Sequence, residues 1–104
     1  MNQESRPPTE LDSADVLEFA RIDASVFHDP DGPYMVADGK ILDSVPGLVI
    51  ARNHYDAADI LLFFCDADWH VLAASGYPTV AEAKHRAERE YRGVSGRWQR
   101  MAGA

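Results

Sequence analysis

The residue types best suited to chemistry lie within six positions, in the segment Cys65-Asp66-Ala67-Asp68-Trp69-His70. A thiol beside an imidazole can form a thiolate–imidazolium pair, which is the core of a nucleophilic site. If residues 67–68 form a hairpin turn, Cys65 faces His70 across two strands, and Phe63 faces Leu72. The sequence indicates neither a third orienting group nor donors for an oxyanion, so Cys65 and His70 are candidates only. We expect Cys65 to be a small buried hydrophobe.

A metal site is the second chemistry that this segment suggests. Cys65 and His70 supply two ligands, whereas a zinc site needs three or four. His54 lies toward the opposite end of its expected strand, and aspartates such as Asp66 and Asp68 are common in tight turns for conformational reasons. The sequence therefore predicts no metal site and no cofactor.

Basic side chains are concentrated near the C-terminus, where they could bind phosphate groups. The candidate basic helix face comprises Lys84, Arg86, Arg89 and Arg92. Three glutamates alternate with these residues at ion-pair spacing, which is typical of a solvated helix face. The net charge is −7, and residues 1–75 carry fourteen acidic against four basic residues. An acidic body repels phosphate backbones, so we expect no nucleic-acid partner.

Length and composition fit one ordinary globular domain. The chain has 104 residues, 46% of them hydrophobic and 26% charged, which disfavours disordered, collagen-like and membrane-spanning proteins. The N-terminus lacks the basic and apolar regions of a secretory signal, and Cys65 is the single cysteine, so we expect a cytoplasmic protein. Polar residues and two prolines predict a mobile tail over residues 1–10, followed by a single domain over 11–104.

The N-terminal half carries two competing periodicities. Residues 13–23 fit a capped helix, whereas apolar residues at every second position from Ala20 to Val26 are typical of a strand. We expect the helix. Turn-forming residues, which include Asp29-Pro30-Asp31-Gly32 and Asp38-Gly39, then predict short extended pieces at residues 33–37 and 40–43.

The strongest signals follow Pro46-Gly47. Segments rich in branched and aromatic residues, separated by acidic turns, predict an antiparallel meander with strands at 48–55, 59–66 and 69–75. Thr79 and Glu82 form a capping box for a helix over 80–92, which Gly93 ends. We expect a hydrophobic clasp after it, formed by Val94, Trp98 and Met101. The fold class is therefore α+β: a mainly antiparallel sheet of three to five strands, a C-terminal helix packed on one face, and the N-terminal helix that competes with a strand.

Both faces of the expected sheet are apolar, whereas a single helix covers only one. We place Trp69 on the face that carries the helix, where Ala83 and Ala87 allow close contact. The opposite face must be covered by the N-terminal residues, by a second copy of the chain or by another protein, because monomers rarely expose so large an apolar patch. The candidate interface comprises Leu61, Phe63, Cys65, His70, Leu72 and Tyr55.

About a third of the chain, residues 62–98, resembles known proteins. The motifs are Asp68-Trp69, Val71-Leu72, Ser75-Gly76-Tyr77, Thr79, Glu82-Ala83-Lys84, Ala87-Glu88, Glu90-Tyr91, Gly93-Val94-Ser95 and Trp98. They look like small uncharacterised bacterial α+β proteins, of the kind encoded by orphan genes, integron gene cassettes or immunity-type genes. The resemblance implies a small bacterial cytoplasmic domain and no particular activity.

Three functions follow as expectations. The first is a non-enzymatic binding or interaction module that acts as a homodimer, because both sheet faces are apolar and no complete catalytic set is present. The second is an immunity- or antitoxin-like acidic protein that binds a basic partner. The third is a small enzyme or metal-binding protein centred on Cys65 and His70.

Overall fold

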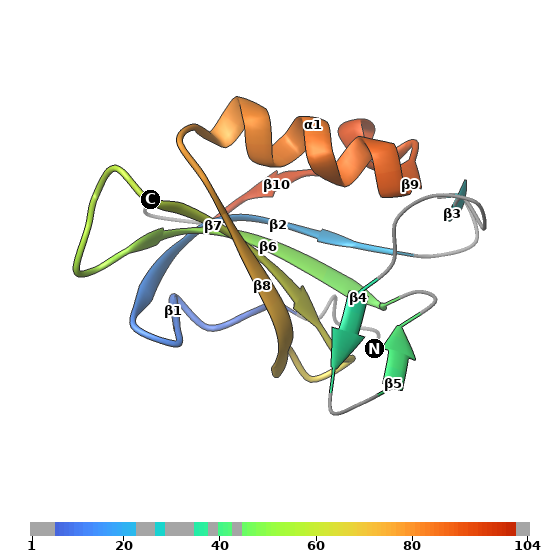
Figure 1. Ribbon diagram of the computed structural model, residues 1–104, viewed down its shortest axis with the longest axis horizontal. Helices are drawn as coiled ribbons and strands as arrows, with labels where there is room; N and C mark the ends of the chain where they lie inside the picture. The colour runs from blue at the N-terminus through green and yellow to red at the C-terminus, as the bar shows by residue number, and fades with distance from the viewer. Residues whose placement is uncertain (1–5, 23–26, 29–34, 38–39, 43–44, 102–104) are drawn as a thin grey trace.

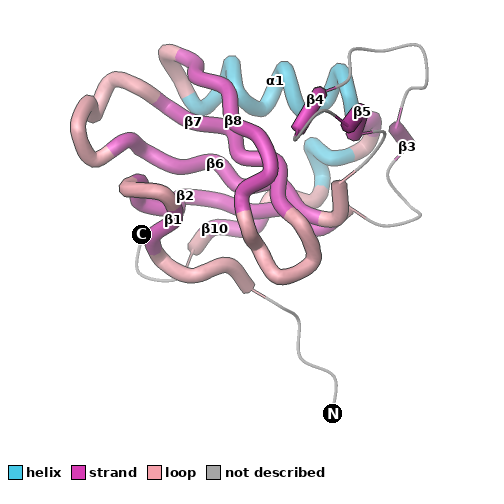
Figure 2. The backbone as a smooth tube through the Cα atoms, turned by 60° about the horizontal axis from the view of Figure 1, so that its bottom comes forward, coloured by secondary structure: helices cyan, strands magenta, loops and turns pink. Residues whose placement is uncertain are grey.

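The computed structural model describes residues 6–22, 27–28, 35–37, 40–42 and 45–101, and it shows the expected α+β fold. One antiparallel sheet has the strand order β1-β2-β6-β7-β8. The strand β10 also pairs with β2, along the same edge of β2 as β1 and opposite β6. The sheet is curled, and the helix α1 lies across one side of it (Figures 1 and 2). The strands are β1 Glu10–Leu11, β2 Ala14–Arg21, β6 Gly47–Asn53, β7 Ile60–Cys65, β8 Val71–Tyr77 and β10 Gln99–Arg100.

Two short strand pairs lie outside this sheet. The strands β4 (Met35–Ala37) and β5 (Lys40–Leu42) pair with each other, which confirms the short extended pieces expected in this region. The strand β3 (Phe27–His28) pairs with β9 (Tyr91–Arg92), directly after α1. The turns expected at 29–32 and 38–39 lie outside the described residues.

The prediction of a helix over residues 13–23 is wrong, because this segment forms the strand β2. A bulge between Val16 and Glu18 interrupts its alternation, so that Val16 and Ala20 show a helix-like spacing although they lie on opposite faces of the sheet. The hairpin turn before β2 is made by Asp12 and Ser13, both with positive φ angles of 48° and 62°. Two central residues of this kind form the type I′ turn that suits a two-residue hairpin.

The helix α1 (Val80–Glu90) confirms the most regular part of the prediction. The Thr79 hydroxyl accepts a hydrogen bond from the backbone N–H of Glu82 at 3.1 Å, and Gly93 has a φ of 97°. The helix ends two residues earlier than expected because β9 begins at Tyr91, and a 3-10 turn, η1 (Val94–Gly96), follows. Ala83 and Ala87 are fully buried against the sheet, as expected.

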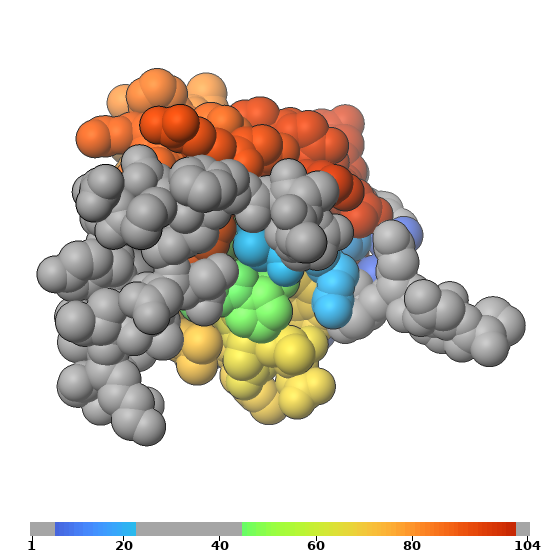
Figure 3. Space-filling view, turned by 90° about the vertical axis from the view of Figure 1, so that its right-hand side faces the viewer, coloured from blue at the N-terminus to red at the C-terminus, as the bar shows by residue number. Residues whose placement is uncertain are grey.

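The core has one cluster on each side of the sheet. The helix-side cluster joins the sheet to α1 and includes Leu48, Ile50, Leu62, Phe64, Ala83, Ala87 and Val94. Figure 3 shows this layering from one end, with the orange helix and the red residues that follow it above the blue, green and yellow strands. The opposite cluster includes Val16, Phe19, Val49, Phe63, Cys65, Trp69 and Met101.

The pairing of β7 with β8 differs from the expected register. Phe63 faces Ala74 instead of Leu72, and Cys65 faces Val71 instead of His70, with a bulge between Phe64 and Cys65. The reason is a longer turn, in which the N–H of Trp69 donates to the carbonyl of Asp66 and Trp69 adopts a positive φ of 68°. Trp69 therefore lies on the face opposite α1, and the expectation that it contacts the helix is wrong.

The chain itself covers the sheet face opposite α1. Trp69 folds back over the face and meets the Phe19 ring edge-on, with the centroids 5.8 Å apart. On the N-terminal side, Pro7 is buried and the Arg6 guanidinium lies 5.6 Å from the centre of the Phe19 ring. Residues 6–10 thus lie against the sheet, while residues 1–5 of the expected tail are outside the described residues. Of the expected clasp, Val94 and Trp98 pack on the helix side and Met101 on this face.

Candidate functional site

The expected Cys65–His70 pair is not formed. Cys65 is fully buried, and burial is the largest cause that raises the pKa of its thiol to about 12. The His70 side chain is exposed, and its Nδ1 lies 3.2 Å from Oδ2 of Asp66. Asp66 also accepts hydrogen bonds from the backbone N–H groups of His70 and Asp68, which lower the pKa of its carboxyl group. This cluster holds a turn in place, and Cys65 and His70 do not form the thiolate–imidazolium pair that their spacing suggested.

The six candidate interface residues do not form one surface. Phe63 and Cys65 belong to the buried cluster opposite α1, and Leu61 packs at its side. Leu72 is 37% exposed on β8, and Tyr55 is 86% exposed in the loop between β6 and β7. The exposed His70 lies at the other end of β7 from Tyr55.

The candidate basic helix face is divided between two sides of α1. Lys84 points toward β2, where its Nζ lies 2.8 Å from Oε1 of Glu18 and 5.9 Å from the centre of the Trp98 ring. Arg86 donates from Nε to the buried Glu90 at 3.2 Å. Arg86 and Arg89 line a shallow groove on α1, whereas Arg92 lies beyond the helix in β9.

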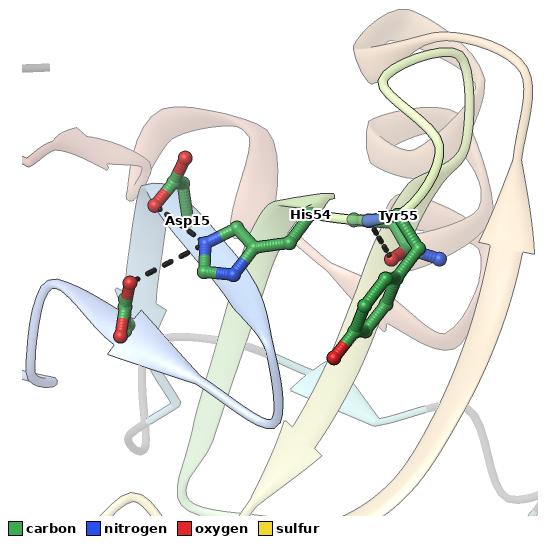
Figure 4. Close-up of polar contacts among 5 residues, drawn as sticks. Asp15, His54 and Tyr55 are labelled. Carbon is green, nitrogen blue, oxygen red and sulfur yellow. Dashed lines mark hydrogen bonds and ion pairs between the residues drawn. The ribbon is translucent and has the colours of Figure 1, made fainter.

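A site that the sequence did not indicate lies where the β1–β2 hairpin meets the β6–β7 loop (Figure 4). The backbone N–H of His54 donates to the carbonyl of Ser13 at 3.0 Å, which fixes the loop against the hairpin. The Nε2 of His54 lies 2.8 Å from Oδ1 of Asp15 and 3.4 Å from Oε2 of Glu10. The hydrogen bond to Asp15 is the largest of the causes that raise the pKa of His54, and it outweighs the lowering effect of desolvation.

Tyr55 follows His54 in a loop that is held by several hydrogen bonds. Its backbone N–H donates to Oδ1 of Asn53 at 2.9 Å, and the side chain of Asn53 donates in turn to Asp59 at 3.1 Å. Asp56 accepts from the backbone N–H of Ala58 at 3.0 Å. We call the exposed carboxylates of the β1–β2 hairpin and of this loop the acidic edge. It comprises Glu10, Asp12, Asp15 and Asp56.

Two groups in the described part of the chain have the spacing of metal ligands. In one, the ligand atoms of Glu10, Asp15 and His54 lie within 4.8 Å of one another, and the other consists of Asp66, Asp68 and His70. In the first group the histidine already contacts both carboxylates. In the second group the Asp66 carboxylate already accepts hydrogen bonds from backbone N–H groups of the turn. These internal contacts account for both groups, and we assign a metal to neither.

Only tertiary pairing creates the acidic edge. Asp15 and His54 are 39 positions apart, and they meet because β2 pairs with β6. The sequence shows a high density of acidic residues in the hairpin and in the loop, but this density alone does not indicate which of them contacts His54. Within the described ranges, no helix is both long and apolar enough to cross a membrane. Comparison with family models, curated proteins and solved structures finds no match, so function is inferred from the geometry of this chain.

Proposed function

We propose that this protein is a non-enzymatic binding module whose acidic edge holds a basic segment of a partner protein. The observation that carries the proposal is Tyr55, an aromatic side chain that is 86% exposed in the loop that meets the acidic β1–β2 hairpin. A tyrosine in a firm loop offers a large contact area at a small entropic cost, and such residues often dominate binding interfaces. Its ring can also receive an arginine or lysine side chain of the partner.

The charge of the molecule supports a basic partner. The full chain has a net charge of −7, and the acidic edge adds a local negative field that steers a cationic partner toward Tyr55. This charge distribution supports the immunity- or antitoxin-like alternative, which the resemblance of residues 62–98 also suggests. A bacterial cytoplasmic location remains part of the proposal, because the single cysteine, Cys65, is a free thiol. The buried thiol gives no support to an enzyme centred on that residue.

A homodimer is a second candidate function. Its interface would be the edge strand β8, because the chain itself covers both faces of the sheet. The strand Val71–Tyr77 contains no charge and no proline, the devices that usually protect an exposed edge. The strand β4 passes near β8 without pairing with it, and Leu72 is 37% exposed. A second copy could add its own β8 in antiparallel pairing. Light scattering over a hundredfold range of concentration tests this, with Leu72→Lys expected to shift a dimer to monomer. A constant monomer mass for the unmodified chain would exclude it.

The acidic edge is tested with a defined probe, a synthetic twelve-residue peptide of alternating arginine and serine. Titration of the full chain, followed by backbone amide NMR shifts, is expected to saturate with the largest shifts at residues 54–56. Tyr55→Ala should weaken binding by at least about fivefold, the loss typical of an interface anchor. Asp56→Asn keeps the oxygen that caps Ala58 and should weaken binding by about twofold at low salt.

The matched control is Asp68→Asn, which removes an exposed charge at the opposite end of β7. Its affinity for the peptide should equal that of the unmodified chain. Shifts spread evenly over all exposed carboxylates, together with an unchanged affinity of Tyr55→Ala, would show a general charge effect and overturn the proposal.

A further inference from the structure

A groove of about 370 Å³ lies on the helix side of the sheet, at the beginning of α1. Three strands and the first residue of the helix contribute to its walls. The lining residues are Leu17 and Glu18 of β2, Arg52 of β6, Arg100 of β10 and Val80 of α1. The groove thus combines an apolar part with two arginines that are far apart in the sequence.

Strand pairing brings both arginines to this side of the sheet. Arg52 follows Ile50 by two positions on β6, and Ile50 belongs to the helix-side cluster, so Arg52 points to the same side. Arg100 is the direct cross-strand partner of Glu18, whose carboxylate contacts Lys84 of α1. Directly paired residues project from the same face of a sheet, which places Arg100 on the helix side as well.

The carboxylates nearest to these arginines along the strands are engaged elsewhere. Glu18 lies 2.8 Å from Nζ of Lys84, and Asp15, the cross-strand partner of Arg52, lies 2.8 Å from His54. Within the part of the chain that the structure describes, neither Arg52 nor Arg100 forms an ion pair. Because Arg52 and Arg100 line the same groove, an anion bound there is attracted by two positive charges.

We propose that this groove binds the phosphate group of a small organic phosphate monoester. A monoester carries between about −1.5 and −2 charges at pH 7, which matches the two guanidinium groups of Arg52 and Arg100. The planar guanidinium can donate two parallel hydrogen bonds to phosphate oxygens. Leu17 and Val80 provide an apolar contact for the organic part of the ligand. The positive end of the α1 dipole, at Val80, adds to the attraction.

Another groove, on the exposed side of α1, serves as an internal comparison. Like the first groove, it is lined by two arginines and a glutamate, here Arg86, Arg89 and Glu82. It differs because Arg86 is bonded to the buried Glu90, whereas the glutamate of the first groove, Glu18, is paired with Lys84. Substitution of Arg89 tests whether loss of any exposed arginine has the same effect as loss of Arg52 or Arg100.

The experiment is a calorimetric titration of the full chain with phenyl phosphate and with inorganic phosphate, at constant ionic strength set with sodium chloride. Phenyl phosphate should bind saturably and more tightly than inorganic phosphate, because only the ester contacts the apolar part of the groove. Arg52→Gln and Arg100→Gln should each weaken binding by about tenfold or more, as expected for charge-assisted hydrogen bonds. Arg89→Gln should bind within about twofold of the unmodified chain.

Three outcomes would overturn the proposal. If phenyl phosphate does not saturate, or if Arg89→Gln weakens binding as much as the groove variants do, the attraction is unspecific. Equal affinities for the two probes would reject an organic monoester and leave free phosphate as the ligand. Backbone NMR spectra of each variant test whether the fold is retained, which distinguishes loss of binding from loss of structure.

Discussion

The indole ring of Trp69 lies directly against the backbone of Gly47. A Cβ atom placed on residue 47 would be 2.6 Å from Cζ3 of Trp69, which is far closer than real contacts allow. The indole also has the Arg21 guanidinium above it, 5.6 Å from the ring centre. The absence of a side chain at Gly47 therefore lets Trp69 cover the sheet face opposite α1.

The first prediction concerns this contact. Gly47→Ala should lower the free energy of unfolding by about 1–3 kcal/mol, because the added methyl group displaces the indole or shifts the strand. Gly96→Ala is the matched control, since a Cβ there would meet no atom within 4 Å. Urea unfolding at pH 7, followed by tryptophan fluorescence, measures both. Equal midpoints for the two variants would show that Trp69 does not rest on Gly47 in solution.

Much of the C-terminal half could be predicted because its signals are local. Thr79 and Gly93 mark the two ends of the helix region through their own backbone preferences, and the strands after Pro46 are dense in branched and aromatic residues. The strand β2 was not predicted because the bulge at Leu17 breaks the alternation of apolar and polar residues on which strand prediction relies. Pairing with β6, which lies about thirty positions away, selects the strand over the helix.

The sites were harder to predict than the fold because they depend on register. A positive φ at Trp69 lengthens one turn and moves Cys65 away from His70, which no propensity scale would indicate for a tryptophan. The ion pair of His54 with Asp15 and the groove at Arg52 both require the pairing of β2 with β6. Residue types could therefore suggest these chemistries, but only the tertiary structure assigns partners.

The second prediction is that the thiol of Cys65 is inert in the native state. Burial, together with the charges of Asp66 and Asp12, raises its pKa to about 12, so almost no thiolate exists at pH 8. We expect no reaction with a chromogenic disulfide reagent over one hour at pH 8, and one equivalent of reaction after unfolding in urea. The unfolded chain is its own control because it contains the same single cysteine. Rapid native reaction would place the thiol at the surface.

The third prediction concerns the carboxylate of Glu88, which ties the end of α1 to the following turn. It accepts hydrogen bonds from the backbone N–H groups of Gly93 and Ser95 and from the Ser95 hydroxyl. These bonds lower the pKa of Glu88 below its ordinary value of 4.5, and the bond from the N–H of Gly93 has the largest effect. A lowered pKa in the folded state adds stability above pH 4.5 that is lost as the pH falls through the folded pKa.

Glu88→Gln should therefore be less stable than the unmodified chain at pH 7, and the difference should shrink as the pH falls below 4.5. Urea unfolding at a series of pH values measures the difference. Asp68→Asn is the control, because its side-chain carboxylate caps neither α1 nor the turn that follows it. A difference between Glu88→Gln and the unmodified chain that is constant from pH 7 to pH 3 would contradict the role of the charged carboxylate.

The last prediction concerns the bond between His54 and Asp15. Because this bond raises the pKa of His54 above 6.5, Asp15→Asn should lower that pKa, and Glu10→Gln should lower it less. A raised pKa in the folded state adds stability that is complete below pH 6.5 and is lost as the pH rises through the folded pKa. The stability difference between the unmodified chain and Asp15→Asn should therefore be larger at pH 6 than at pH 9. NMR titration of the His54 ring and urea unfolding measure the two effects, with Asp68→Asn as a control that leaves the His54 titration unchanged. An identical titration of His54 in Asp15→Asn would show that the β1–β2 hairpin does not meet the β6–β7 loop in solution, and the acidic edge would then not exist as one surface.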